Sequence, residues 1–216
     1  MTNLQDYWNK KHLKYAQQDW IDEPNIFAEQ CLQYLPQNGR ILDMGAGQGQ
    51  DARFFAKKGY QIVAIDFSTK ALELARQKLP ISLKNKVKFK KLDLAEKLPF
   101  KDSSFEAVYA HLSIHYFTQQ KTRQIFGEIY RVLAPNGILA ILVNSTMDPE
   151  YGQGEKIEEY LYKFDHGIVK RFFDMKSVAD FTSKFKTLLL DNRGMTYKDK
   201  KIGTSNLIRF IGQKVW

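Results

Sequence analysis

Short apolar runs recur along the middle of the chain, and segments with helical periodicity separate them. We predict five strands here, at residues 41–44, 61–65, 87–91, the stretch that ends at 110, and 138–143. Largely apolar, β-branched runs of this length are typical of strands buried on both faces of a parallel sheet. Strand and helix alternate through residues 40–143, and this order predicts an α/β fold with right-handed crossovers.

Helix start and stop signals support this order. Pro24 opens a helix predicted from Asn25 to Tyr34, because proline is favoured in the first turn. Gly59 is a candidate left-handed C-terminal cap for the helix after the first strand. Ser68 is placed to cap the next helix. Each predicted helix therefore has a local reason to begin or end where it does.

The first strand leads directly into a glycine-rich turn. Glycines stand at positions 45, 47 and 49, and a helix-forming segment follows at once. Glycine permits positive φ angles, and its missing Cβ lets a ligand lie against the main chain. The free N–H groups and the positive dipole at the start of the following helix favour a carboxylate or phosphate nearby. The turn therefore predicts a nucleotide-like ligand.

The spacing of the glycines distinguishes between nucleotides. The dinucleotide turn has the form G-x-G-x-x-G/A, but Gln50 occupies its third small position. The pattern that begins at Asp43 is D-x-G-x-G-x-G, which resembles motif I of the class I S-adenosylmethionine-dependent methyltransferases. This resemblance implies that the methionine end of the donor is received by Asp43, Gly45, Ala46, Gly47 and Gly49.

A carboxylate ends the second predicted strand. Asp66 follows the apolar run at 61–65, and an acid at this tip of a parallel sheet accepts hydrogen bonds from both ribose hydroxyls of an adenosine. A strand-end aspartate is also common as a turn or capping residue, and that alternative stays open. Phe67 follows Asp66, and we expect its ring to lie on the adenine face.

The resemblance implies further residues of the donor site. In the methyltransferase family, the position after the third strand gives a carboxylate to the adenine amino group and a backbone N–H to the ring, and Asp93 and Leu94 stand there. A solvated loop aspartate is the plain alternative for Asp93. The resemblance also places Ala110 and His111, at the end of the fourth strand, beside the methionine end of the donor.

Two later motifs extend the resemblance over about two thirds of the chain. Residues 98–108, LPFKDSSFEAV, are similar to the family's L-P-F-x-x-x-x-F-D-x-V, with Glu106 in place of Asp. Residues 128–137, EIYRVLAPNG, are similar to E-x-x-R-V-L-x-P-G-G, with Asn136 in place of glycine. The resemblance implies a Rossmann-like fold: a seven-stranded, mostly parallel sheet with an antiparallel C-terminal strand and helices on both faces.

The expected organisation is a single methyltransferase domain over residues 1–216. We predict an N-terminal helical cap (1–36), a donor-binding core (37–143), an acceptor-side insertion (144–185) and C-terminal strands (186–216). The insertion resembles that of tellurite-resistance-like and related small-molecule methyltransferases. Two runs, 184–190 and 207–212, predict a final antiparallel pair. Aromatic residues of the cap, with Lys10 and Lys14 among them, fit either plain packing or a lid over the ligand.

The composition of the chain limits the class of protein. The 216 residues include one cysteine, Cys31, which excludes an internal disulfide framework and favours the cytoplasm. No apolar run approaches the ~20 residues that a membrane span needs. The net charge of +9 makes nucleic acid possible as a partner, but the lysines are scattered, so we do not favour it. We expect a monomer or a homodimer.

The chemistry expected is in-line transfer of a methyl group from S-adenosylmethionine to a small molecule, leaving S-adenosylhomocysteine (EC 2.1.1.-). His111 and His115 stand four residues apart, one turn if the segment is helical, and could face one pocket. We name His115 as the candidate catalytic base or substrate contact, although packing is the plainer role, and we expect no metal site. The alternatives are an RNA or protein methyltransferase and a non-catalytic module that binds S-adenosylmethionine.

Overall fold

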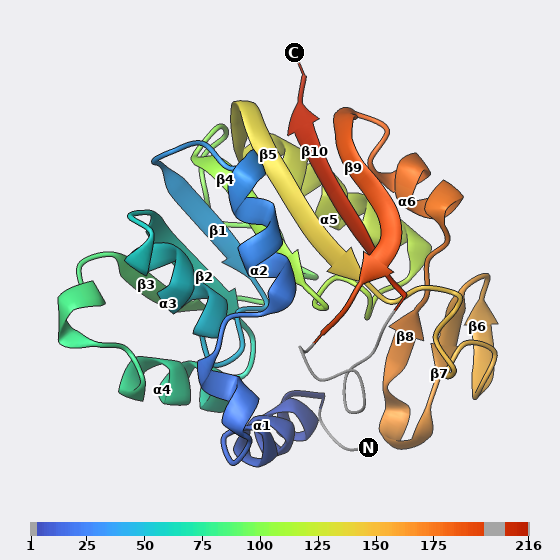
Figure 1. Ribbon diagram of the computed structural model, residues 1–216. Coiled ribbons are helices and arrows are strands. Elements are labelled where there is room, and N and C mark those ends of the chain that lie inside the picture. Colours follow the sequence, from blue (N-terminus) through green and yellow to red (C-terminus); the bar gives the residue numbers. More distant parts are fainter. Residues whose placement is uncertain (1–3, 197–205, 216) are drawn as a thin grey trace.

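The computed structural model describes residues 4–196 and 206–215, and its centre is a seven-stranded sheet (Figure 1). The strands lie in the order β3-β2-β1-β4-β5-β10-β9. Their bounds are β1 (Arg40–Met44), β2 (Gln61–Asp66), β3 (Val87–Lys91), β4 (Phe105–His111), β5 (Leu133–Val143), β9 (Phe185–Gly194) and β10 (Leu207–Lys214). Strands β1 to β5 pair in parallel, and β10 is antiparallel to both of its neighbours. The predicted fold class is confirmed.

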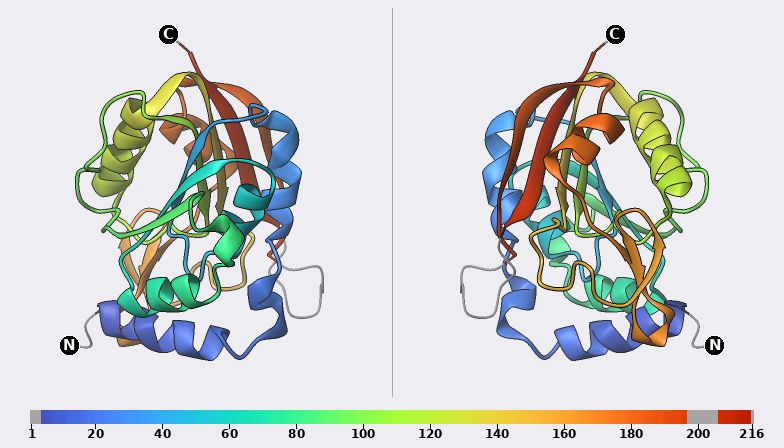
Figure 2. Two further views of the ribbon diagram at one scale, coloured as in Figure 1. Left: turned by 90° about the vertical axis from the view of Figure 1, so that its left-hand side faces the viewer. Right: turned by 90° about the vertical axis from the view of Figure 1, so that its right-hand side faces the viewer.

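Helices cover both faces of this sheet (Figures 1 and 2). The α-helices are α1 (Leu4–Tyr15), α2 (Ile26–Cys31), α3 (Gln50–Lys57), α4 (Thr69–Gln77), α5 (Gln119–Val132) and α6 (Met175–Phe181). Short 3-10 helices occur at Asp19–Asp22, Leu32–Tyr34, Ile81–Leu83 and Asp165–Gly167. Helices α2 and α3 lie on one face and α5 and α6 on the other. Helix α1 crosses the end of the sheet where the parallel strands finish.

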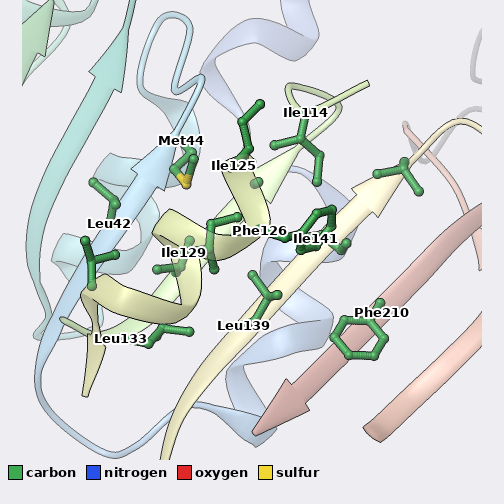
Figure 3. Packing of buried hydrophobic residues seen from close by; sticks show 14 of the residues in the cluster. Leu42, Met44, Ile114, Ile125, Phe126, Ile129, Leu133, Leu139, Ile141 and Phe210 are labelled. Carbon is green, nitrogen blue, oxygen red and sulfur yellow. The ribbon is translucent and has the colours of Figure 1, made fainter. Parts of the chain in front are cut away.

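The core consists of two layers because side chains alternate between the faces of each strand. Leu42 and Met44 of β1 point to the face that carries α5, where Ile125 and Ile129 meet them (Figure 3). Ile41, one residue along, belongs to the opposite layer, with α2 and α3. Both faces are buried, as the largely apolar strand sequences predicted.

Two of the predicted caps are present. The Ser68 side chain accepts a hydrogen bond from the N–H of Ala71, so it caps α4. Gly59 follows α3 with φ of 107°, in the region that favours glycine. Both positions therefore start or stop a helix for the local reasons given by the sequence.

The fifth strand differs from its prediction. It was expected to begin at Ile138, after a Pro-Asn-Gly turn, but β5 begins at Leu133, directly after α5. Leu133 already pairs with Phe105, and the next pair is Ala107 with Ile138. The four residues between form a bulge in the ladder, with Asn136 at φ of 61°. The Pro-Asn-Gly sequence thus bends the strand and does not precede it.

A second sheet, which the sequence did not predict, lies in the insertion. Its three antiparallel strands are β6 (Glu155–Glu158), β7 (Leu161–Lys163) and β8 (Val169–Arg171). Arg171 is 2% exposed and ties β8 to the loop after β4, because its Nε donates to the carbonyl oxygen of Phe117 at 3.0 Å. Its guanidinium also pairs with Glu158. The small sheet therefore supports one side of that loop.

Within the described residues, no helix combines the length and apolar character needed to cross a membrane. The predicted division of the chain into cap, core, insertion and C-terminal strands stays a prediction, and residues 1–3, 197–205 and 216 of its outer segments lie outside the described residues. The cytoplasmic location and the oligomeric state likewise stay predictions.

Candidate functional site

A cavity of about 420 Å³ lies at the carboxyl ends of β1, β2 and β4, beneath α1. Open parallel sheets bind ligands at this edge, where the strand order reverses between β1 and β4. The lining residues come from the glycine turn, the tips of the three strands, the loop after β4 and the N-terminal segment. The cavity thus joins segments that are far apart in the sequence.

The glycine turn forms one side of the cavity and requires glycine for two reasons. Gly45 and Gly47 have φ angles of 75° and 54°, where other residues are strained. The space beside them is also taken: a Cβ on Gly45 would stand 2.3 Å from the Cβ of Ser113, and one on Gly47 would stand 3.1 Å from Cε1 of His12. The turn is therefore packed from both sides.

Asp66 sits at the tip of β2, 7% exposed, and is held by the main chain. Its carboxylate accepts hydrogen bonds from the N–H groups of Gly47, at 2.9 Å, and Ser68, at 2.8 Å. Burial raises the pKa of Asp66, and these hydrogen bonds oppose the rise. The β2 tip and the glycine turn are thus joined through one carboxylate.

Asp43, at the end of β1, is 2% exposed, and its Oδ2 atom has no hydrogen-bond partner among the described residues. Burial, followed by the charges of Asp51 and Asp66, raises the pKa of Asp43 well above its usual value. A buried carboxylate oxygen left without a partner is costly unless a ligand completes it. Asp43 is therefore prepared for a cation or a hydrogen-bond donor.

Asp51, at the start of α3, also lines the cavity, although the sequence did not single it out for ligand binding. Its carboxylate accepts hydrogen bonds from the N–H and the side-chain amide of Asn25, at 2.8 and 2.7 Å, and from the hydroxyl of Tyr109, at 2.8 Å. Asp51 thereby ties α2 to β4 beneath the cavity. Its partners are remote in the chain, so no local motif reveals it.

Several other buried polar atoms at the cavity lack a partner among the described residues: Nδ1 of His12, Oε1 of Gln48, Oε1 of Gln50 and Nε2 of His111. Together with Oδ2 of Asp43, three of these five atoms are oxygens that only accept hydrogen bonds. Native proteins leave few such groups without a partner. The cavity therefore fits a polar ligand that brings hydrogen-bond donors.

A row of aromatic rings lines the side of the cavity next to α1, and we call these five residues the aromatic roof. They are Tyr116, Trp8, His12, Tyr15 and Trp20, all of which line the cavity. Neighbouring ring centroids along the row lie 5.2, 6.2, 5.8 and 5.4 Å apart. Four of the rings belong to residues 8–20, within the predicted cap, whose role as a lid stays a prediction.

Polar contacts fasten α1 to the rest of the cavity. Oδ1 of Asn9 accepts hydrogen bonds from Oγ of Ser68, at 2.7 Å, and from the N–H of Lys70, at 3.2 Å. The Gln48 side chain donates to the carbonyl oxygen of His12 at 2.8 Å. These contacts reach the β2 tip and the glycine turn, so α1 is docked on both donor-side elements.

The structure brings most of the predicted donor-binding residues to the cavity. Those that line it are Asp43, Gly45, Ala46, Gly47, Asp66, Phe67, Asp93, Leu94 and His111. Gly49 and Ala110 are not among the lining residues. A Cβ on Gly49 would meet the Phe89 ring at 2.9 Å, so this glycine serves packing against β3. Ala110 is fully buried in the core.

His115 does not line the cavity. It is 2% exposed and packs on Tyr116, with the ring centroids 4.3 Å apart. Burial lowers its pKa to about 3, with smaller contributions from the charges of Lys170 and His111. The segment is not helical: His111 ends β4 and His115 lies in the following loop, so the condition for the one-turn relation is not met. A catalytic role for His115 stays a prediction.

Neither histidine of the cavity, His12 or His111, is hydrogen-bonded to a carboxylate in the described part of the chain. Burial lowers the pKa of His12 to about 4 and also lowers that of His111. Among the described residues, no group of three or more His, Cys, Asp and Glu side chains is arranged to hold a metal ion. The polar chemistry of the site thus rests on carboxylates, amides and imidazoles.

Sheet order, the β1 turn and the cavity together define the architecture of the class I S-adenosylmethionine-dependent methyltransferases. Residues 41–137 match the family model described as a methyltransferase domain. The predicted resemblance is thereby confirmed: this stretch of the chain is a methyltransferase domain.

Curated relatives agree with this family. The ubiquinone/menaquinone biosynthesis C-methyltransferase UbiE of Geotalea daltonii is 35% identical over 123 residues, 56% of this chain and 51% of that protein. The demethylmenaquinone methyltransferase of Thermus thermophilus is 36% identical over 105 residues, 48% of this chain and 46% of that protein. The chain therefore spans about half the length of the curated relatives that it matches.

Solved structures show the same fold. The N1-methyltransferase for 1,6-didemethyltoxoflavin from Burkholderia thailandensis, solved with that compound and S-adenosylhomocysteine, has a TM-score of 0.75 and 18% identity. The match covers 99% of this chain and 88% of that one. An S-adenosylmethionine-dependent methyltransferase from Methanosarcina mazei has a TM-score of 0.69 and 24% identity, over 85% of this chain and 95% of that one.

Proposed function

We propose that this protein transfers a methyl group from S-adenosylmethionine to a small molecule (EC 2.1.1.-). The observation that carries the proposal is the cavity itself, where the glycine turn, the Asp43 carboxylate and the Asp66 carboxylate meet at one edge of a methyltransferase sheet. Together they offer two negative groups and a bare backbone to an adenosine-containing cation.

The residues present fit this donor. Asp66 is placed to accept hydrogen bonds from the ribose hydroxyls, since a carboxylate oxygen has capacity beyond its bond to Gly47. Asp43 offers its unpartnered Oδ2 to the ammonium group of the methionine end. Asp93, Leu94 and Phe67 border the adenine side. When bound, the donor supplies a methyl group already activated on a positively charged sulfur.

The protein's own contribution is alignment and exclusion of water. The aromatic roof covers the cavity, and the docked α1 helix keeps solvent from the strand tips. Holding two reactants in line is worth as much as ~7–11 kcal/mol in favourable cases. A cavity of this size suits a small acceptor, and among the structural neighbours the Burkholderia thailandensis enzyme is named for a small heterocycle.

Isothermal titration calorimetry tests the proposal. We expect S-adenosylmethionine and S-adenosylhomocysteine to bind and NAD not to bind. Asp66→Asn keeps the shape of the side chain but loses its charge, and we expect it to weaken both ligands by about 10- to 100-fold. Asp180→Asn, an exposed change on α6, is the matched control and should bind normally. Unchanged binding by Asp66→Asn would refute the ribose assignment, and no binding by the natural protein would refute the function.

A further inference from the structure

The cavity and the whole chain have opposite electrostatic character. The chain carries a net charge of +9, yet four carboxylates line the cavity: Asp43, Asp51, Asp66 and Asp93. None of the described lining residues is Lys or Arg. Even with Asp43 and Asp66 engaged by the proposed donor, an anionic acceptor would find no protein cation among the described lining residues to pair with it.

The wall that faces these acids is aromatic. The rings of Trp8 and Tyr116 meet edge to face, 5.2 Å apart, and they come from α1 and from the loop after β4. Phe117, Leu4 and Ile21 add apolar surface around them. Flat rings pack well on such a wall, and aromatic faces also attract cations, most strongly where water is excluded.

Among the groups that could accept a proton at the cavity, Asp43 is taken by the ammonium group of the proposed donor, and four others are poorly suited to do so. His12 and His111 have lowered pKa values because they are buried. Asp51 and Asp66 are already hydrogen-bonded within the protein. A general base works best when its pKa lies near the working pH. An acceptor that keeps its protons would place no such demand on the site.

We propose, on the basis of the proposed function, that the acceptor is an uncharged flat ring compound that is methylated on a lone pair of nitrogen or sulfur and leaves as a cation. The lone pair forms the new bond to the methyl carbon, the carbon–sulfur bond of the donor breaks, and its electron pair stays on sulfur. The positive charge passes from the sulfur to the acceptor, and no proton is released. The four carboxylates of the cavity and the aromatic roof favour both the cationic donor and the cationic product.

Calorimetric titration of the protein saturated with S-adenosylhomocysteine tests this inference with three probes of one size: N-methylquinolinium, quinoline and 2-naphthoate. We expect N-methylquinolinium to bind most tightly and quinoline next, with 2-naphthoate weaker than N-methylquinolinium by about tenfold or more. Binding of 2-naphthoate as tight as that of N-methylquinolinium, or binding of none of the three, would overturn the inference.

Variants of Trp8 test whether the preference for N-methylquinolinium arises at the aromatic roof. Trp8→Leu should remove most of the preference for N-methylquinolinium over 2-naphthoate, and Trp8→Phe should keep part of it because a ring remains. Phe54→Leu, which changes an aromatic residue of α3 outside the cavity lining, should keep the preference. A preference that survives Trp8→Leu in full would contradict the role of the aromatic roof.

The same experiment separates this inference from the proposed function. S-adenosylhomocysteine is titrated first, and failure to bind it would remove the proposed function and this inference together. Binding of S-adenosylhomocysteine followed by the reverse order of the three probes would remove only the inference. Methylation of 2-naphthol in preference to quinoline, with a proton released per methyl group, would also overturn it.

Discussion

The floor and the roof of the cavity are built in different ways. The floor consists of strand tips and the glycine turn, whose carboxylates are held by buried hydrogen bonds to the sheet and its helices. The roof rests on α1, where His12 is the buried residue, and on ring contacts between α1 and neighbouring segments. The floor is thus part of the central sheet and its turns, whereas four of the five roof rings belong to the N-terminal segment.

The largest expected effect comes from a floor glycine. Gly45→Ala would place a Cβ 2.3 Å from that of Ser113 at a φ of 75°. We expect the free energy of unfolding, measured with urea, to fall by about 2–5 kcal/mol. Gly127→Ala is the matched control, since no heavy atom lies within 4 Å of its added Cβ. It lies within α5 and should gain up to ~1 kcal/mol from helix propensity. Equal effects would contradict the packing of the floor.

The next largest effect on stability is expected from His115 at acidic pH. Its folded pKa of about 3 is lower than its usual 6.5, so the unfolded chain binds the proton first. The stability it contributes is present above pH 6.5 and is lost as the pH falls toward 3. Between pH 7 and pH 4, the free energy of unfolding should therefore fall less for His115→Phe than for the natural protein. We expect the difference to be about 2–4 kcal/mol in urea titrations at each pH. Parallel pH curves for the two proteins would show that His115 is not buried as described.

A smaller effect with the opposite sign is expected at Asp43. Its pKa is raised in the folded protein, so the folded state holds the proton more tightly and stability falls as the pH rises past the usual value of 3.8. Asp43→Asn removes that penalty and should stabilise the ligand-free protein at pH 8 by about 1 kcal/mol. The same variant should lose most of the thermal stabilisation given by S-adenosylmethionine. A less stable variant that still binds the donor would contradict the assignment of Asp43.

An effect on stability of similar small size is expected in the roof. Asn9→Ala removes the acceptor of the hydrogen bonds from Ser68 and Lys70, and it should cost about 0.5–1.5 kcal/mol. Amide hydrogen exchange should become faster in α1 and stay unchanged in β1 and β2. Lys10→Ala, an exposed change on the same helix, is the control. Equal acceleration in β1 would show that floor and roof are one cooperative unit.

The sequence predicted the floor well because its chemistry is local. One short motif contains the strand, the turn and Asp43, and a second strand ends at Asp66. Asp51 was missed because its partners, Asn25 and Tyr109, are 26 and 58 residues away in the chain. The one-turn relation of His111 and His115 depended on a helix, and tertiary contacts hold that segment as a loop: the N–H of Arg171 donates to the carbonyl oxygen of His115 at 2.7 Å.

The three-stranded sheet was missed for a related reason. Its strands have three or four residues, and β6 reads Glu-Lys-Ile-Glu, with no apolar face of its own. Pairing with β7 and β8, and not local periodicity, makes it a strand. The cap was predicted as helical with aromatic spacing, but the sequence left packing and closure as alternatives. The structure places the five rings in the cavity lining, and closure over a ligand stays a prediction.

The most direct measurement is an amide and indole NMR spectrum recorded during titration with S-adenosylhomocysteine. It observes the floor through the main-chain N–H groups of Gly45 and Gly47 and the roof through the indole N–H of Trp8. If floor and roof enclose one donor site, all three resonances shift together and saturate at a single dissociation constant. Shifts confined to residues outside the cavity, with the two glycine amides unmoved at saturation, would contradict the site.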